Sequence, residues 1–374
     1  MKALIIGGGI IGNAVAWRLA RAGLDVTIVE RSRSGQEASW AAAGMIAPQV
    51  EIEGPGPFVR FCVQAKQTFE ALLPELIEQS GIDPEYDDGS GVIYAALSDQ
   101  DRAELAGRAA WQRAAGLQVE EISGEDARAL VPALSPRVNY ALRFPNENRV
   151  ENRRLTQAYL IAALKAGAAL QEESRVDAIE TRGGKFSGLR LHGGGLLEAD
   201  VAINAAGSWA SLIRGLEADN ISLHPIRGQI VCFETQPNLI GPAIFSLRGY
   251  AVPRRDGRLV AGSTREQAGY SKNVTLEGME SIVHAAKDML PALAGIRFRE
   301  AWAGLRPATS DYLPVLGLSP SVPGVYYAAG HFRSGILLSA ITGQLLAAMV
   351  TGSKLDIDIA PFSPARFNGR PAAG

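Results

Sequence analysis

The chain has 374 residues, 47% of them hydrophobic and 20% charged, with a formal net charge of −2 at pH 7. This balance is typical of a globular protein of two domains, and it excludes the strongly basic surface by which many proteins bind nucleic acid. The two cysteines, Cys62 and Cys232, lie far apart, so no metal-type or redox spacing is present.

No targeting or membrane segment is predicted. Met1 leads directly into the first predicted strand, which argues against a cleaved signal peptide. The longest apolar stretch, residues 336–350, contains several polar residues and is too short to span a bilayer. We therefore expect a cytoplasmic protein without an integral membrane segment.

The first thirty residues predict a dinucleotide-binding unit. An apolar strand over 2–6 enters Gly7-Gly8-Gly9-Ile10-Ile11-Gly12, a helix follows to about residue 22, and a second strand over 25–29 ends at Glu30. The helix N-terminus offers unpaired N–H groups to phosphate. This GxGxxG motif in its strand–turn–helix context is specific for a dinucleotide, but it does not distinguish NAD from FAD.

The glycines and the acidic residue of this unit have separate expected roles in binding. Gly7 permits the tight turn, Gly9 lets the backbone approach a pyrophosphate, and Gly12 lets the helix pack closely on the sheet. Glu30, at the tip of the second strand, is placed to accept hydrogen bonds from an adenosine ribose.

The segment after Glu30 contains a run of small residues, 41–44, which we expect to press against a flat ring or a phosphate. The alternative is the start of a short alanine-rich helix. Residues 58–80 form a predicted amphipathic helix, which Pro74 should kink or divide and Gly81 should end. Further predicted helices cover 99–116, 125–130, 155–166 and 279–289, and predicted strands include 92–96, 175–180 paired with 188–191, and 201–207.

This alternation predicts an α/β protein with a Rossmann-like nucleotide domain assembled from residues 1–80, 143–215 and 300–374. The insertions 81–142 and 216–299 are strand-rich. We expect them to form an antiparallel-sheet, substrate-binding domain over the cofactor.

Two stretches of the tail identify a family. They are Trp302-Ala303-Gly304-Leu305-Arg306-Pro307-Ala308-Thr309 and Ala328-Ala329-Gly330-His331-Phe332-Arg333-Ser334-Gly335. With the N-terminal glycine motif, the 41–45 segment and the strand 250–254, they resemble the glycine oxidase branch of the D-amino-acid oxidase family over nearly the whole chain.

The resemblance implies FAD bound without a covalent link. The covalent branch of the superfamily attaches flavin through a cysteine in the tail, whereas no cysteine follows Cys232 here. The implied cofactor contacts are Gly7, Gly9, Ile10, Ile11, Gly12, Glu30, Arg31, Ser39, Ala43, Gly44, Met45, Val176, Ala206, Gly207, Gly330, His331, Phe332, Arg333, Ser334, Gly335, Ile336 and Leu337.

Arg306 is the candidate for binding a substrate carboxylate, because a guanidinium matches a carboxylate with two parallel N–H bonds. A structural ion pair is the alternative. The resemblance implies that Tyr250 supports Arg306 and that Arg333 touches substrate and flavin surroundings; taken alone, Tyr250 is more typical of packing. The glycine-rich context of His331 indicates orientation or packing rather than a catalytic base.

The implied reaction is oxidative deamination of glycine, sarcosine or a D-amino acid. The amine lone pair assists hydride transfer to the flavin, the imine hydrolyses to a 2-oxo acid and ammonia, and dioxygen becomes hydrogen peroxide. No dedicated general base is needed, and the sequence offers no convincing one. Within the family such an enzyme can feed thiamine biosynthesis, and its members commonly form homo-oligomers.

One feature departs from the family pattern, which has an apolar residue where this chain has Arg265. A two-residue hairpin loop at Asp256-Gly257 would place Tyr250 opposite Ser263 and Arg248 opposite Arg265. Facing arginines repel unless an anion lies between them, so Arg248 and Arg265 become candidates for selecting an acidic amino or imino acid. Met45 is a further candidate for substrate specificity. The alternative is that Glu266 or another acid neutralises Arg265 at the cavity rim.

Three other functions stay open at this stage. A D-amino-acid dehydrogenase would pass electrons to a quinone or carrier instead of dioxygen. A flavoprotein subunit of a larger complex would show no activity alone. An NAD-dependent dehydrogenase is disfavoured by the tail motifs.

Overall fold

The computed structural model describes residues 1–368 except 88, 238 and 355–356, so those positions and 369–374 of the predicted domain segments lie outside the description. Its first layer is a six-stranded sheet in the order β18-β19-β12-β1-β2-β8. These strands are β1 (Lys2–Ile6), β2 (Asp25–Val29), β8 (Ala169–Gln171), β12 (Val201–Asn204), β18 (Val315–Leu318) and β19 (Val325–Ala329). All neighbours are parallel except β18 and β19.

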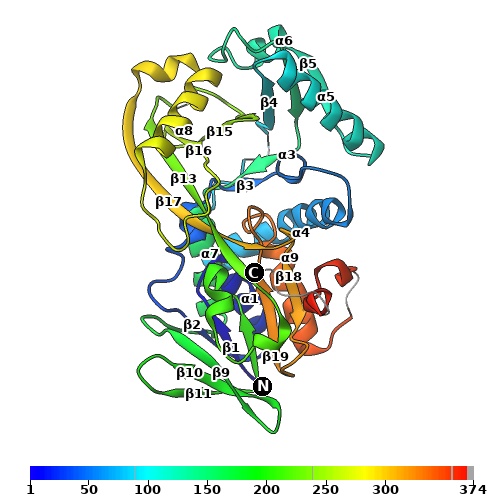
Figure 1. Cartoon of the computed structure of the whole chain (residues 1–374), viewed down its shortest axis with the longest axis vertical. Coiled ribbons are helices and arrows are strands. Elements are labelled where there is room, and N and C mark those ends of the chain that lie inside the picture. Colours follow the sequence, from blue (N-terminus) through cyan, green and yellow to red (C-terminus); the bar gives the residue numbers. More distant parts are fainter. Residues whose placement is uncertain (88, 238, 355–356, 369–374) are drawn as a thin grey trace.

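Four helices pack beside this sheet and build the larger core. α1 (Ile10–Arg21) contacts α7 (Asn152–Lys165) and α9 (Ser339–Thr351), and α4 (Pro57–Ser80) contacts α7 and α9 as well. Their apolar side chains, including Trp17, Phe69 and Tyr159, are almost completely buried together. In Figure 1 this layer is the lower half of the molecule.

The second layer is an eight-stranded sheet in the order β17-β13-β16-β15-β14-β4-β6-β5, antiparallel except where β14 meets β4. Its strands are β4 (Val92–Ala96), β5 (Glu120–Ser123), β6 (Tyr140–Phe144), β13 (Leu223–Glu234), β14 (Ala243–Ser246), β15 (Gly249–Pro253), β16 (Arg258–Gly262) and β17 (Arg297–Thr309). The helices α5 (Asp99–Ala114), α6 (Gly124–Leu130) and α8 (Leu276–Met289) lie around it in the upper half of Figure 1.

Smaller elements complete the fold. A three-stranded sheet joins β9 (Val176–Arg182), β10 (Lys185–Leu191) and β11 (Leu196–Glu198), and a two-stranded sheet pairs β3 (Met45–Ile46) with β7 (Asn148–Arg149). The short helices are α2 (Ala38–Ala41) and α3 (Pro48–Glu51).

Two long strands connect the layers. β13 and β17 descend from the upper sheet towards the lower one (Figure 1), and β17 contacts both α2 and the 3-10 helix Gly207–Leu212 beside the nucleotide sheet. The carboxyl half of β17, which carries Arg306, is thereby brought beside the dinucleotide motif.

The predicted α/β fold with a Rossmann-like sheet is confirmed, whereas the predicted division of one helix is wrong. α4 continues through Pro74 to Ser80 and ends at Gly81, whose φ is +76°. Pro74 lies on the exposed face, where the carbonyl that lacks a partner can turn towards water, while Leu73 and Leu76 anchor the buried face. The domain boundaries stay a prediction; the one at residue 300 falls within β17.

Candidate active site

The glycine-rich turn is packed so tightly that side chains cannot enter it. A Cβ on Gly12 would lie 1.9 Å from the carbonyl oxygen of Gly7, and one on Gly7 would lie 2.6 Å from that of Ala205. Gly7 also has a φ of +105°, a conformation that L-residues rarely adopt. The turn therefore brings bare backbone to the start of α1, as close binding of a pyrophosphate requires.

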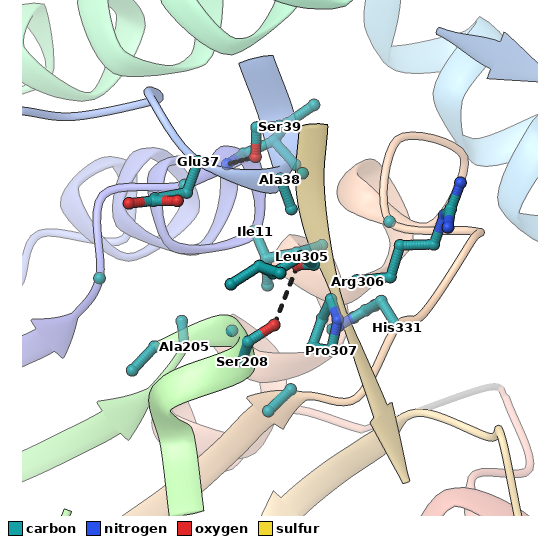
Figure 2. Close-up of a pocket in the computed structure, with 18 of the residues that line it drawn as sticks. Ile11, Glu37, Ala38, Ser39, Ala205, Ser208, Leu305, Arg306, Pro307 and His331 are labelled. Atoms are coloured by element: carbon teal, nitrogen blue, oxygen red, sulfur yellow. Dashed lines mark hydrogen bonds between the residues drawn. The ribbon is translucent and has the colours of Figure 1, made fainter. Parts of the chain in front are cut away.

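A single cavity of about 570 Å³ extends from this turn to Tyr250 and Arg306. Figure 2 shows Glu37 at one end of the view and Arg306 at the other, with Ile11 and Leu305 between them. The dinucleotide motif and the proposed substrate clamp thus belong to one continuous site.

The nucleotide end of the cavity is built around Glu30. Its Oε2 accepts a hydrogen bond from the backbone N–H of Gly8 at 2.7 Å, and its Oε1 accepts one from Ser32 at 3.0 Å. These bonds fix the buried carboxylate at the tip of β2, where it lines the cavity. Trp209, which no sequence motif marked, also lines this end, and the Arg31 guanidinium stacks on its ring at 3.4 Å from the ring centroid.

Most of the predicted cofactor residues line this cavity: Gly7, Gly9, Ile10, Ile11, Glu30, Arg31, Ser39, Ala43, Gly44, Met45, Val176, Ala206, Gly207, His331, Phe332, Arg333, Gly335 and Ile336. Gly12, Gly330, Ser334 and Leu337 do not line it. Gly12 supports the turn from behind, Gly330 takes a φ of +72° next to Thr309, and Leu337 is packed in the core. The short helix α2 ends at Ala41, the first residue of the small-residue run 41–44, and all four residues of the run line the cavity.

Arg306 lines the cavity, and the described part of the chain provides no acidic partner for it. Its Nη1 donates to the carbonyl of Thr264 at 3.1 Å and its Nη2 to the hydroxyl of Ser263 at 2.7 Å. Among the described residues no carboxylate forms an ion pair with it. Burial lowers the pKa of this guanidinium, and the missing counter-charge makes the position suited to an anionic ligand.

Arg333 has a different environment, because it is already paired. Its Nη2 lies 2.7 Å from Oε2 of Glu51, and its Nη1 lies 3.4 Å from Oε1 of Glu53. The loop before it is tied to β17 by the N–H of Phe332, which donates to the carbonyl of Pro307 at 2.9 Å.

Tyr250 is placed with Arg306 and Arg333 along the same cavity. Burial raises the pKa of its hydroxyl, and the positive charge of Arg306 opposes that rise. Glu51 lines this end too and was not predicted from the sequence. Its helix, α3, has only four residues, too few to show a periodicity that would mark the position.

The predicted pairing of Arg248 with Arg265 is wrong. The hairpin turns over three residues, 255–257, with Arg254 N–H bonded to the carbonyl of Arg258, so Tyr250 pairs with Gly262 and the register differs by one residue. Arg248 lies outside the cavity, within 3.6 Å of Asp101.

Arg265 is neutralised by an acid, as the alternative prediction stated. The acid is Glu53, whose Oε1 accepts from Nη2 of Arg265 at 2.8 Å. Glu266 instead accepts hydrogen bonds from Arg227 and Gln229. An anion held between two facing arginines is thereby excluded by the geometry.

His331 is buried, with its Nε2 3.0 Å from the hydroxyl of Thr342. Burial lowers its pKa to about 3, so the ring is neutral near pH 7, which agrees with a packing role. Met45 is buried in the cavity wall. Neither Cys62 nor Cys232 lines the cavity, which fits a cofactor that is not attached through sulfur.

Comparison with known proteins identifies the group to which the chain belongs. Residues 2–349 match the model of the family described as FAD dependent oxidoreductase. The chain is 32% identical to a glycine oxidase of Geobacillus kaustophilus over 98% of this chain and 97% of the relative. It is also 32% identical to hydrogen cyanide synthase subunit HcnC of Pseudomonas aeruginosa, over 99% and 97% of the two chains.

Solved structures agree with this assignment. The crystal structure of glycine oxidase from Geobacillus kaustophilus superimposes with a TM-score of 0.93, at 32% identity and with coverage of 97% of this chain and 98% of that one. None of the helices in the described part of the chain is long and apolar enough to cross a membrane. The family match over residues 2–349 and the full-length similarity to glycine oxidases show that the chain belongs to the FAD-dependent oxidoreductase family and is an enzyme of the amino acid oxidase type.

Proposed function

We propose that this protein oxidises glycine or a related small amino acid, such as sarcosine or a D-amino acid, with FAD as the cofactor. The products from glycine are a 2-oxo acid, ammonia and hydrogen peroxide formed from dioxygen. The observation that carries the proposal is Arg306, a guanidinium within the cavity that has no acidic partner in the described chain.

The residues around Arg306 would have different roles in binding the substrate carboxylate. Ser263 and the carbonyl of Thr264 fix the guanidinium in place, so that its remaining donors can bind a carboxylate bidentately. The hydroxyl of Tyr250 adds a further donor beside it. Such fixation holds the α-carbon in one orientation, and orientation is a major part of what a protein contributes when a cofactor carries the redox chemistry.

FAD, when bound, supplies the electron sink for the hydride. The residues predicted to hold it are the glycine turn, Glu30 and the 330–337 loop. The similarity to proteins named glycine oxidase, over nearly the full length of both chains, supports a small amino acid as the substrate.

The proposal is tested by replacing Arg306 with leucine and measuring anaerobic bleaching of the flavin by glycine, sarcosine and D-alanine. Loss of one partner of a buried charge pair costs about 2–5 kcal/mol, so the second-order rate of reduction should fall at least ~30-fold. Arg248→Leu is the matched control because Arg248 lies outside the cavity. A reduction rate in Arg306→Leu equal to that of the control would refute the carboxylate assignment.

A second function has support of its own. The similarity to HcnC, which by name is a subunit of hydrogen cyanide synthase, favours a flavoprotein that works within a complex. This function would be favoured if the flavin of the purified chain stays oxidised with every small amino acid tested. The same flavin should then be reduced once a co-purifying second chain is added back. A D-amino-acid dehydrogenase that uses another electron acceptor is the remaining alternative in chemistry.

A further inference from the structure

A second cavity, of about 610 Å³, adjoins the first beside Arg333. Its walls come from residues 51–58, 265–267 and 311–313 and from the tail loop 331–334, with Ile226. Four residues line both cavities: Glu51, His331, Phe332 and Arg333. Glu51 is the one carboxylate that faces both among the residues the structure describes.

The carboxylate of Glu51 is held in place but incompletely satisfied. Its side chain is only 11% exposed, and its Oε2 lies 2.7 Å from Nη2 of Arg333. That approach meets the distance of an ion pair without hydrogen-bond geometry, and Oε2 has no hydrogen-bond donor among the described residues. A buried carboxylate oxygen in this state can accept a proton or a hydrogen bond from a ligand.

The segment that carries Glu51 is fixed from behind. The backbone N–H groups of Gln49 and Val50 donate to Oε2 of the buried Glu147 at 2.9 and 3.3 Å. From the other side, Nη1 of Arg108 donates to the carbonyls of Gln49 and Ile52 at 3.0 and 2.7 Å. The orientation of Glu51 towards the cavities is therefore set by its surroundings.

The sequence predicted no dedicated general base, but the substrate must still lose one ammonium proton, to solvent or to a side chain, before hydride transfer. The substrate arrives as an ammonium ion, whereas departure of the α-hydrogen as hydride requires the nitrogen lone pair. In this part of the cavity Arg333 is paired with Glu51 and Glu53, whereas Arg306 has no carboxylate partner among the described residues. Glu51 is the anionic group that lies along the same wall.

We propose that Glu51 binds the substrate ammonium and accepts its proton. An N–H bond breaks with its electron pair remaining on nitrogen, and an O–H bond forms on the Glu51 carboxylate. Because Glu51 also lines the second cavity, the proton can then pass to water there without crossing the reacting centre. This inference rests on the proposed amino acid oxidation.

Charged and titratable groups from several neighbouring elements face Glu51. Arg333 and Glu53 are its nearest charged neighbours, and its charge also acts on groups behind and across the cavity. The charged and titratable groups facing it are Arg333, Arg306, Tyr250, Tyr94, Glu53, Glu147, Cys62, Arg108 and the neutral His331.

The test is anaerobic reduction of the flavin by glycine between pH 6 and 10 in Glu51→Gln and in the wild type. General acid–base groups contribute roughly 10²–10⁴-fold, so Glu51→Gln should be slower by about 10²-fold at pH 7. The deficit should shrink as the pH approaches the pKa of the substrate ammonium, because the neutral amine then comes from solution. Glu51→Asp, which keeps a carboxylate, should recover part of the rate at pH 7.

Glu53→Gln is the matched control, since Glu53 contacts Arg333 but lines only the second cavity; its pH profile should follow that of the wild type. Binding of glycolate, which offers a carboxylate but no amine, should perturb the flavin spectrum equally in wild type and Glu51→Gln. Parallel pH profiles for the wild type and Glu51→Gln would overturn the role of Glu51 but leave the proposed function intact. A wild-type flavin that glycine, sarcosine and D-alanine all fail to reduce would overturn the proposed function and this inference with it.

Discussion

At the scale of single residues, the two arginines of the cavity differ in what surrounds them. Arg333 is balanced by Glu51 and Glu53, whereas Arg306 is bonded only to a hydroxyl and a carbonyl. A sequence shows that an arginine is present but not whether an acid lies beside it. Arg306 could be selected from its motif, while its lack of an acidic partner among the described residues, which suits it to a carboxylate, required the structure.

The same limit explains the residues that sequence reasoning missed or misplaced. Glu51 reaches the cavity from a four-residue helix, without any local pattern to indicate its direction. Arg248 and Arg265 were paired by assuming a two-residue turn, and one additional residue in the turn moves alternate side chains to opposite faces. Register depended here on turn geometry, which the Asp-Gly pair did not determine.

His331 should affect stability in acid rather than catalysis at neutral pH. Its pKa falls to about 3 in the folded protein from an ordinary value of 6.5, so the unfolded chain binds a proton first as pH falls. Folding stability is then unaffected above pH 6.5 and is lost progressively below it, by about 2 kcal/mol at pH 5.

Thermal unfolding of wild type and His331→Gln at pH 5 and pH 8 measures this effect. The wild type should lose more stability between the two pH values than the variant does. Equal losses would mean that the imidazole is not held neutral by burial.

At the scale of elements, the strand–turn–helix unit and the long strand β17 have separate tasks. The strand–turn–helix unit could be predicted in detail, because its glycines are required by the local backbone geometry. A Cβ at Gly12, for example, would clash with the carbonyl of Gly7. The position of β17 could not be predicted, since its partner β13 begins more than seventy residues earlier in the chain. Pairing between distant segments is not encoded in local periodicity.

Replacing Gly12 with alanine should reduce FAD affinity at least tenfold, because the added methyl would lie 1.9 Å from the carbonyl oxygen of Gly7 and must displace the turn. Flavin fluorescence during titration of apoprotein with FAD measures the change. Gly107→Ala in α5 is the control, since its Cβ would meet no atom within 4 Å and should stabilise that helix by about 1 kcal/mol. Unaltered FAD affinity in Gly12→Ala would contradict the close packing of the turn.

At the scale of the whole molecule, two sheets of different kinds meet at one cavity. The parallel-rich sheet contributes the dinucleotide motif, and the mainly antiparallel sheet contributes Tyr250 and Arg306 through β15 and β17. The two layers are visible as the lower and upper halves of Figure 1. One end of this cavity holds the glycine motif expected to bind the cofactor, and the other end holds Arg306, the proposed carboxylate site.

The family and the two-layer plan could be predicted because tail motifs and the N-terminal unit occur together in one chain. What remained beyond prediction was the meeting of segments such as α3, the 331–334 loop and β17 around a shared wall. That wall lies between the two cavities, and it brings Glu51 and Arg333 close enough to Arg306 for their charges to interact with its guanidinium.

The central claim is oxidation of a small amino acid with dioxygen as the electron acceptor. The most direct measurement follows purified, FAD-loaded protein with glycine under air, and counts hydrogen peroxide against ammonia released. The account predicts flavin reduction by glycine and one peroxide for each ammonia. A flavin that glycine, sarcosine and D-alanine all leave oxidised would contradict it. Ammonia released from glycine with hydrogen peroxide far below one to one would contradict dioxygen as the electron acceptor.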